Sequence, residues 1–445
     1  MKLPTRVFAT LCFSASLFLV SHSAKPARAQ DDETDGELIL LVDPLDLLAQ
    51  QPTTQPPTTQ PPTTPDSPSD RPPVRPDNTR ETPRTRTRAP IRRSTSFRRS
   101  STRLARAPDI FGDILSSGQL SAQTNFNFVT ADIPLSSGAR RTKIAEHNKA
   151  LTDDRAFFLF HHFENAVGFT RAPGPNTPPI SFTDRSIDRY TIGVERSLAE
   201  GLWSIEVRMP FTSGVNIQEN SPALPAQPDF QLFSGQVGDI SVALKHQLYE
   251  DDTLGIAAGL GVTAPTGSDV QGFLPFAAPA AAQFRISNDA IHLLPFIGFV
   301  TTPSERCFAH GFLQVDVPTN GNRVIATNGV GGLATGRLNE STLLYLDGSI
   351  GYWLHQDPTR RWMRGVAVSG ELHYTRSLQS ADSMPFFNGV FGDGDGRVEF
   401  LNGTIGLHCA LTAGTSVRVA AVLPLLGGVR RSFDAEAQAA IIRQF

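Results

Sequence analysis

The sequence predicts an all-β fold: a transmembrane, up-and-down antiparallel β-barrel of about 12 strands (10–14) behind a disordered N-terminal tail. Three observations predict it. An export signal opens the chain, apolar and polar residues alternate with a period of two from residue 155 onward, and short and long connections alternate between those segments. The length of 445 residues allows one such barrel, and the charges nearly balance, with 40 Lys and Arg against 43 Asp and Glu.

Residues 1–29 are predicted to be a secretory signal peptide. Lys2 and Arg6 precede an apolar stretch, and residues 27–29 form an A-x-A sequence that predicts cleavage after Ala29. No later apolar run approaches ~18 residues, so we expect no membrane helix. The protein is then either soluble outside the cytoplasm or a barrel, because a closed barrel is the other fold that satisfies its backbone polar groups in lipid.

Residues 30–107 form a tail that we expect to be disordered. It begins with an acidic stretch and continues with Gln-Pro-Thr-Thr repeats. It ends in residues 66–107, where twelve arginines accompany four acidic residues. Such a composition cannot bury enough apolar surface to fold. The simplest interpretation is a solvated spacer. Its arginines could also bind anionic cell-envelope polymers, whereas nucleic acid is not an expected partner of an exported chain.

Residues 108–154 are a transitional segment between the tail and the barrel. Within it, residues 139–151 could form one short helix, acting as a plug or as a periplasmic lead-in.

The segment 155–445 alternates as membrane strands do. In residues 202–209, for example, Trp203, Ile205 and Val207 alternate with Ser204 and Glu206. A period of two places successive side chains on opposite faces of a sheet. One face is apolar and suits lipid, and the other is small, polar or charged and suits an enclosed interior.

The connections give the strand count and the orientation. Short connections lie near residues 199–201, 250–252, 302–306, 355–360 and 412–414, and long ones at 168–187, 213–236, 266–290, 319–340 and 378–396. This asymmetry is typical of outer-membrane barrels, which have tight periplasmic turns and long outer loops. The predicted strands are 155–167, 188–198, 201–212, 237–249, 253–265, 291–301, 307–318, 341–354, 361–377, 397–411, 415–425 and 433–445. An even number places both ends of the barrel at the periplasmic side.

The last residue, Phe445, follows an alternating final strand. A terminal aromatic residue in that position resembles the signal read by barrel-assembly machinery, which we therefore expect as a partner together with outer-membrane lipid. Arg443 stands where an apolar residue is typical of that signal.

If the apolar faces contact lipid, the polar residues between them face the lumen. The candidates are Glu206, Arg208, Asp239, Lys245, Asp316, Asp347, Glu371, His373 and Arg418. They could line a polar route for a small solute, or they could pair across strands and fill the barrel, because unpaired buried charge is costly. No catalytic motif, cofactor motif or metal motif stands out, so an enzyme is not expected.

Two stretches resemble the MetA-pathway-of-phenol-degradation outer-membrane family. They are Val237–Lys245, with the pattern Gly-Asp-hydrophobic followed by Lys, and Leu254–Gly267, which ends in Pro-Thr-Gly. The resemblance covers about residues 188–445 and not the tail. It implies a barrel of the kind that passes hydrophobic compounds, with no catalytic residues.

Two functions remain open at this point. The first is a passive channel or transporter for a small molecule, of hydrophobic character if the resemblance holds. The alternative is a structural outer-membrane barrel with a packed lumen, whose tail contacts the cell wall or a periplasmic partner.

Overall fold

The computed structural model describes residues 103–445 apart from fourteen short gaps. The gaps are 114–117, 124–127, 134–139, 172–179, 214, 222–223, 235–236, 275–281, 329–330, 381, 387–388, 393–396, 412–413 and 428–430. The predicted signal peptide and the tail up to residue 102 lie outside the described residues.

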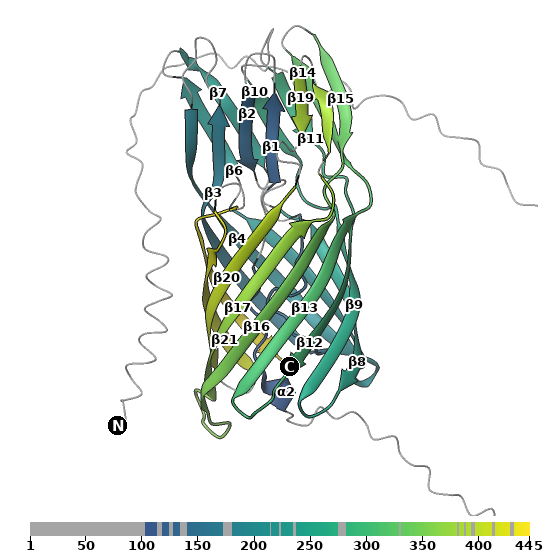
Figure 1. Ribbon diagram of the computed structural model, residues 1–445, viewed down its shortest axis with the longest axis vertical. Coiled ribbons are helices and arrows are strands. Elements are labelled where there is room, and N and C mark those ends of the chain that lie inside the picture. Colours follow the sequence, from purple (N-terminus) through teal and green to yellow (C-terminus); the bar gives the residue numbers. More distant parts are fainter. Residues whose placement is uncertain are drawn as a thin grey trace, which may run out of the picture. The chain divides into compact units, whose positions relative to one another are not determined.

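Twelve antiparallel strands close into a barrel, which confirms the predicted fold class (Figure 1). Each strand pairs with the next along the chain, and β22 pairs with β3 to complete the ring. The strands are β3 (Arg155–Arg171), β4 (Ile180–Leu198), β5 (Trp203–Thr212), β8 (Ile240–Glu250), β9 (Leu254–Ala264), β12 (His292–Thr301), β13 (Cys307–Pro318), β16 (Leu343–Gln356), β17 (Gly365–Ser377), β20 (Glu399–Ala410), β21 (Thr415–Pro424) and β22 (Ala435–Gln444). Short turns join one end of consecutive strands, as at η2 (Ala199–Gly201) between β4 and β5.

The strands have one apolar outer face and one buried inner face. In β12, buried and exposed residues alternate almost without interruption. The outward side chains include Ile350, Leu372 and Ile405, which are 71 %, 57 % and 76 % exposed. A period-two strand with large apolar residues on its solvent-accessible side is the arrangement that a hydrocarbon environment favours.

The long connections are strands and not loops, which corrects the sequence-based prediction. A separate six-stranded antiparallel sheet consists of β6 (Val215–Ser221), β7 (Leu224–Ser234), β10 (Val270–Leu274), β11 (Ala282–Ile286), β14 (Asn322–Asn328) and β15 (Leu333–Leu338). These strands fold because they carry their own core, with Phe284, Ile286 and Val324 buried. β18 (Ser383–Phe386) and β19 (Gly389–Gly392) extend the barrel sheet instead.

Two stretches ahead of β3 lie within the barrel, and we call them the interior segments. They are residues 103–113, which start with α2 (Arg103–Arg106), and residues 140–153. Between them the chain forms the hairpin β1 (Gly118–Gln123) and β2 (Phe128–Ile133). β2 pairs with the far end of β3, and β1 pairs with β19. The chain therefore runs through the ring, turns beyond it and returns before the first barrel strand begins.

The short helix proposed for residues 139–151 is wrong. The described part, residues 140–151, is irregular except for a turn at 144–147, because barrel side chains take the place of helical partners. The Ile144 N–H, for example, donates to Gln314 Oε1 at 2.7 Å. The tail boundary at residue 107 is also wrong, since Leu104 and Ala107 are buried in the core. Among the described residues, no helix is long and apolar enough to cross a membrane.

Candidate functional site

The nine side chains predicted to face the lumen are all buried. Each of Glu206, Arg208, Asp239, Lys245, Asp316, Asp347, Glu371, His373 and Arg418 is at most 5 % exposed. Eight of them contact the interior segments or a residue that does. Asp239 does not: it accepts hydrogen bonds from the Gly267 N–H at 2.7 Å and from Asn288 Nδ2 at 2.6 Å. The Gly-Asp and Pro-Thr-Gly motifs therefore bind each other, which gives them a structural role.

Arg155 joins the largest group of buried charges, and sequence reasoning missed it. Its guanidinium pairs with Glu195 at 2.8 Å, with Glu206 at 2.8 Å and with Asp109 of the first interior segment at 3.0 Å. Arg155 shares its strand face with Phe157, so the alternation marked that face as apolar. One cation on a face that otherwise looks apolar gives no indication in the sequence that it is a buried ion-pair partner.

Lys245 on β8 binds the second interior segment and so connects it to the barrel strands. Its ammonium donates to Asn148 Oδ1 at 2.8 Å, to the Leu151 carbonyl at 3.0 Å and to Glu195 Oε1 at 2.9 Å. Arg208 pairs with Glu206 at 2.6 Å and more loosely with Glu146 of that segment at 3.5 Å. Such charge-assisted bonds to main-chain carbonyls fix the path of an irregular segment.

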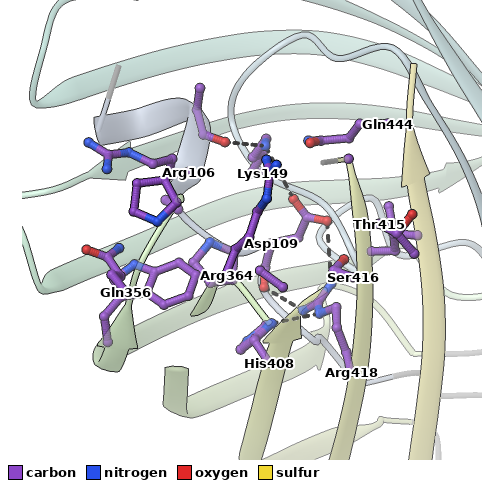
Figure 2. A pocket seen from close by; sticks show the side chains of 18 residues that line it. Arg106, Asp109, Lys149, Gln356, Arg364, His408, Thr415, Ser416, Arg418 and Gln444 are labelled. Atoms are coloured by element: carbon purple, nitrogen blue, oxygen red, sulfur yellow. Dashed lines mark hydrogen bonds and ion pairs between the residues drawn. The ribbon is translucent and has the colours of Figure 1, made fainter. Parts of the chain in front are cut away.

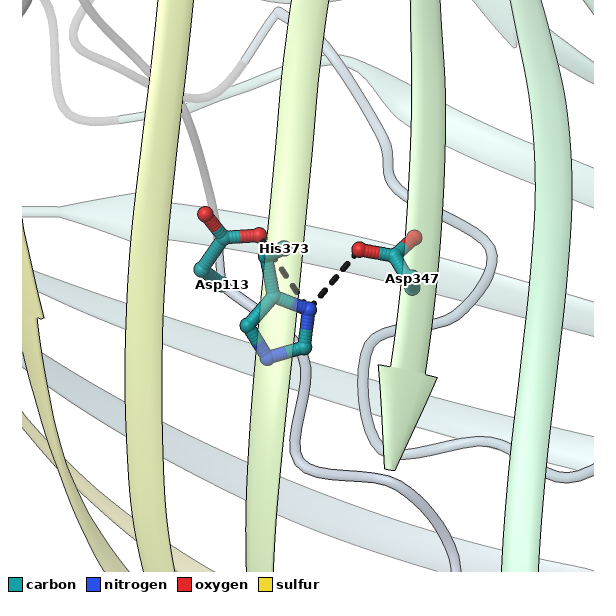
Figure 3. Close-up of side chains that lie close together, drawn as sticks. All are labelled: Asp113, Asp347 and His373. Atoms are coloured by element: carbon teal, nitrogen blue, oxygen red, sulfur yellow. Dashed lines mark hydrogen bonds and ion pairs between the residues drawn. The ribbon is translucent and has the colours of Figure 1, made fainter. Parts of the chain in front are cut away.

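A second group of charges lies where both interior segments meet β16 and β17 (Figure 3). His373 Nδ1 lies 2.8 Å from Asp347 Oδ1 and 3.8 Å from Asp113 Oδ1. These three side chains are close enough together to hold a metal ion. However, the Lys143 ammonium already binds Asp113 and lies 2.7 Å from Asp347, so it supplies the positive charge that a metal would bring. The group is better described as a set of ion pairs that holds both interior segments against the ring of twelve strands, which we call the wall.

Glu371 binds the main chain of the first interior segment. Its carboxylate accepts from the N–H groups of Phe111 and Gly112, both at 3.0 Å. Two converging amides on one carboxylate act as a small anion-binding nest. Residues 111–112 are thereby fixed against β17.

The third group holds the start of the second interior segment near the long-connection end. Arg141 pairs with Asp316 at 3.0 Å and with Glu340 at 2.8 Å, and His292 lies 2.6 Å from Asp316. Burial by itself raises the pKa of Glu340, but the neighbouring cations Arg141, His292 and Arg140 outweigh it and lower that pKa from 4.5 to about 2.

The Glu340 pairing predicts a pH-dependent contribution to stability. A carboxyl with a lowered folded pKa stabilises fully above its unfolded pKa and loses that contribution as the pH falls through its folded value. We expect Glu340→Gln to lower the free energy of unfolding by about 3 kcal/mol at pH 6, and by almost nothing at pH 2. Urea unfolding at both pH values measures this. Glu200→Gln, in an exposed short turn, is the control and should show no such difference.

The interior also brings a serine and a histidine together, in a geometry that does not suit catalysis. Ser369 Oγ lies 3.4 Å from His408 Nε2. Arg418 Nε donates to His408 Nδ1 at 2.9 Å, and arginine has no acceptor, so Nδ1 must carry the lone pair. Neutral His408 then holds its proton on Nε2 and donates to the serine. It cannot accept the proton that a serine nucleophile must lose.

Phe445 lies just after β22 and is 62 % exposed. Its N–H donates to the Asp154 carbonyl at 3.1 Å, and its ring lies 5.6 Å from the Arg196 guanidinium. The ring is thus accessible at the short-turn end. Its recognition by assembly machinery stays a prediction.

The comparison with protein-family models found no matching family, and the search of curated proteins found no matching relative. The resemblance drawn from Val237–Lys245 and Leu254–Gly267 therefore stays a prediction.

Several solved structures are similar to this chain as barrels. An outer membrane channel from Pseudomonas putida F1 is 12% identical, with a TM-score of 0.41, covering 66% of this chain and 96% of that one. The Pseudomonas putida toluene transporter TodX is 10% identical, with a TM-score of 0.35 and coverage of 69% and 94%. A KdgM porin is 7% identical, with a TM-score of 0.33 and coverage of 65% and 99%. At these identities and scores, what those proteins transport says nothing about this chain.

Proposed function

We propose that this chain is an outer-membrane β-barrel that gives a small solute a passive route, and that its own interior segments close that route in the folded state. The observation that carries the proposal is the ring of twelve strands with an apolar outside and a charged inside. Lipid is the environment in which an exposed belt of Ile, Leu and Phe is stable, and a closed ring leaves no unpaired strand edge there. A hydrophobic character of the solute is the finer part of the proposal, and it rests on the family resemblance alone.

The interior segments explain how the route is closed. They form hydrogen bonds and ion pairs with inward side chains of β3, β4, β5, β8, β13, β16, β17, β20, β21 and β22. All of these contacts between side chains and segments are noncovalent. Because ion pairs and hydrogen bonds can break and reform, a segment can shift while the ring stays closed, and solute passage would require such a shift.

Conductance in a planar bilayer tests this function. We expect the wild type to show rare, brief current steps. The double variant Arg141→Ala, Lys143→Ala removes two of the cations that tie the second interior segment to Asp316, Glu340, Asp113 and Asp347. Its open fraction should rise about tenfold or more, since each 1.4 kcal/mol removed from the closed state is a factor of ten. Arg361→Ala, an exposed cation in the turn after β16, is the matched control and should behave as the wild type.

Silence of the folded double variant would contradict the channel. It would favour the second candidate, a structural barrel with a packed lumen, which the density of buried ion pairs specifically supports. In that case the tail carries the function. Full-length chain should then bind isolated cell-wall polymer or a periplasmic partner, and a chain lacking residues 30–102 should not.

A further inference from the structure

A cavity of about 240 Å³ lies at the short-turn end, between the first interior segment and the wall (Figure 2). One side comes from residues 105–109 and Lys149, and the other comes from β16, β20, β21, β22 and the turn between β16 and β17. We propose that this cavity binds a small organic carboxylate. The site is independent of whether solute crosses the barrel, because binding at one end needs no open path.

The charges around the cavity favour an anion. Four of its lining side chains are cations, namely Arg106, Lys149, Arg364 and Arg418, and one is a carboxylate, Asp109. Asp109 is already shared, because it pairs with Arg155 at 3.0 Å and with Arg418 at 3.4 Å. Lys149 also pairs with Asp153 at 3.1 Å, so the excess positive charge of the cavity rests on Arg106 and Arg364, and a bound anion would balance it.

Arg364 is the cation best placed to meet a ligand. It is half-buried, its Nε is shielded from solvent, and that Nε has no hydrogen-bond partner among the residues that the structure describes. Within the same described part of the chain, neither Arg364 nor Arg106 forms an ion pair. A buried guanidinium donor without a partner costs free energy, and a carboxylate offers two oxygens in the geometry that this group prefers.

The remaining lining selects an organic anion over an inorganic one. Trp353, Pro108, Pro358 and Ile442 add apolar surface to the lining, and Thr415 and Ser416 add hydroxyl groups. Apolar side chains combined with a few polar groups are the usual lining of a small-molecule site. The volume suits a compact molecule, such as a short-chain or single-ring carboxylic acid. Inorganic phosphate would leave the apolar lining residues without a contact.

Saturation-transfer NMR and calorimetry on the full chain in non-ionic detergent test the proposal. Benzoate is the probe, and acetate, benzylamine and inorganic phosphate are the comparisons. We expect saturable binding of benzoate, weaker binding of acetate and phosphate, and none of benzylamine. Arg364→Gln should weaken benzoate binding about tenfold, the loss expected for one charge-assisted pair. Arg361→Gln, three residues earlier and outside the cavity lining, should leave it within about twofold.

Heat-modifiable gel mobility verifies that each variant is folded. If Arg364→Gln does not fold, Arg106→Gln takes its place, because Arg106 is exposed and its loss leaves no buried group unpaired. Absence of benzoate binding, equal binding of benzylamine, tighter binding of phosphate, or an equal loss in Arg361→Gln would each overturn the proposal. Because none of these measurements involves transport, a negative conductance result does not bear on them.

Discussion

Replacing Arg155 with methionine should lower the free energy of unfolding by about 3–5 kcal/mol, the cost of removing one partner from a buried ion-pair group. Arg155 is 1 % exposed and holds three carboxylates, two from the wall and one from an interior segment. Without the guanidinium, Glu195, Glu206 and Asp109 would each lose a buried partner. Lys245, Arg208 and Arg418 alone would then have to offset the repulsion among the three carboxylates. Urea unfolding of the barrel in lipid vesicles, followed by tryptophan fluorescence, measures the change.

Arg196→Met is the matched control for that experiment. Arg196 lies on the neighbouring strand β4, is 60 % exposed and pairs with Asp154 only at 3.7 Å. Screened by solvent, such a pair contributes about 0–1 kcal/mol. An Arg155→Met effect as small as the control would mean that water reaches the carboxylates, and the interior would then be a wet channel and not a packed one. Arg155→Lys should recover little, because an ammonium cannot reach three carboxylates in the fork geometry.

Placing a charge on the outer belt should have the second large effect. Ile405 lies near the middle of β20 and is 76 % exposed. If that face contacts hydrocarbon, Ile405→Arg costs about 2–4 kcal/mol, the value for arginine near the centre of a bilayer. Less folded protein should also appear in the outer-membrane fraction of expressing cells. In water, the same substitution at an exposed site would be almost neutral.

Leu333→Arg separates lipid contact from simple exposure. Leu333 is 58 % exposed and lies on β15, in the six-stranded sheet outside the barrel ring. We expect this variant to unfold as the wild type does. Equal, small effects at both positions would remove the evidence that the belt faces lipid, and the proposed localisation would fail with it.

The barrel strands were predictable from the sequence because each strand has an apolar outer face and a polar inner face. Apolar and polar residues therefore alternate along it. The predicted segment 307–318 is β13 residue for residue, and the strand after it differs only by two residues at each end. The lining was predictable for the same reason. Glu206 and Arg208 alternate with apolar neighbours, so their common face followed directly.

The interior segments were not predictable from the alternation of apolar and polar residues. Residues 140–153 have no regular secondary structure, so no periodicity marks them, and Lys143 finds Asp113 and Asp347 only once the barrel has closed. The helix expected there fails because amides such as that of Ile144 bind barrel side chains. The strands of the six-stranded sheet do not stand out in the sequence, because Pro and Gly interrupt their alternation. Even so, Phe284 and Ile286 are buried and give those strands a core of their own.

The path of the interior segments restricts the order in which the molecule can assemble. The β1–β2 hairpin lies beyond one end of the ring, while both of its leads pass through it. If β22 paired with β3 before the hairpin folded into place, the hairpin would have to pass through a closed ring whose interior is already filled with side chains. The seam between β22 and β3 should therefore be the last pairing to form, with the wall wrapping around a preassembled centre.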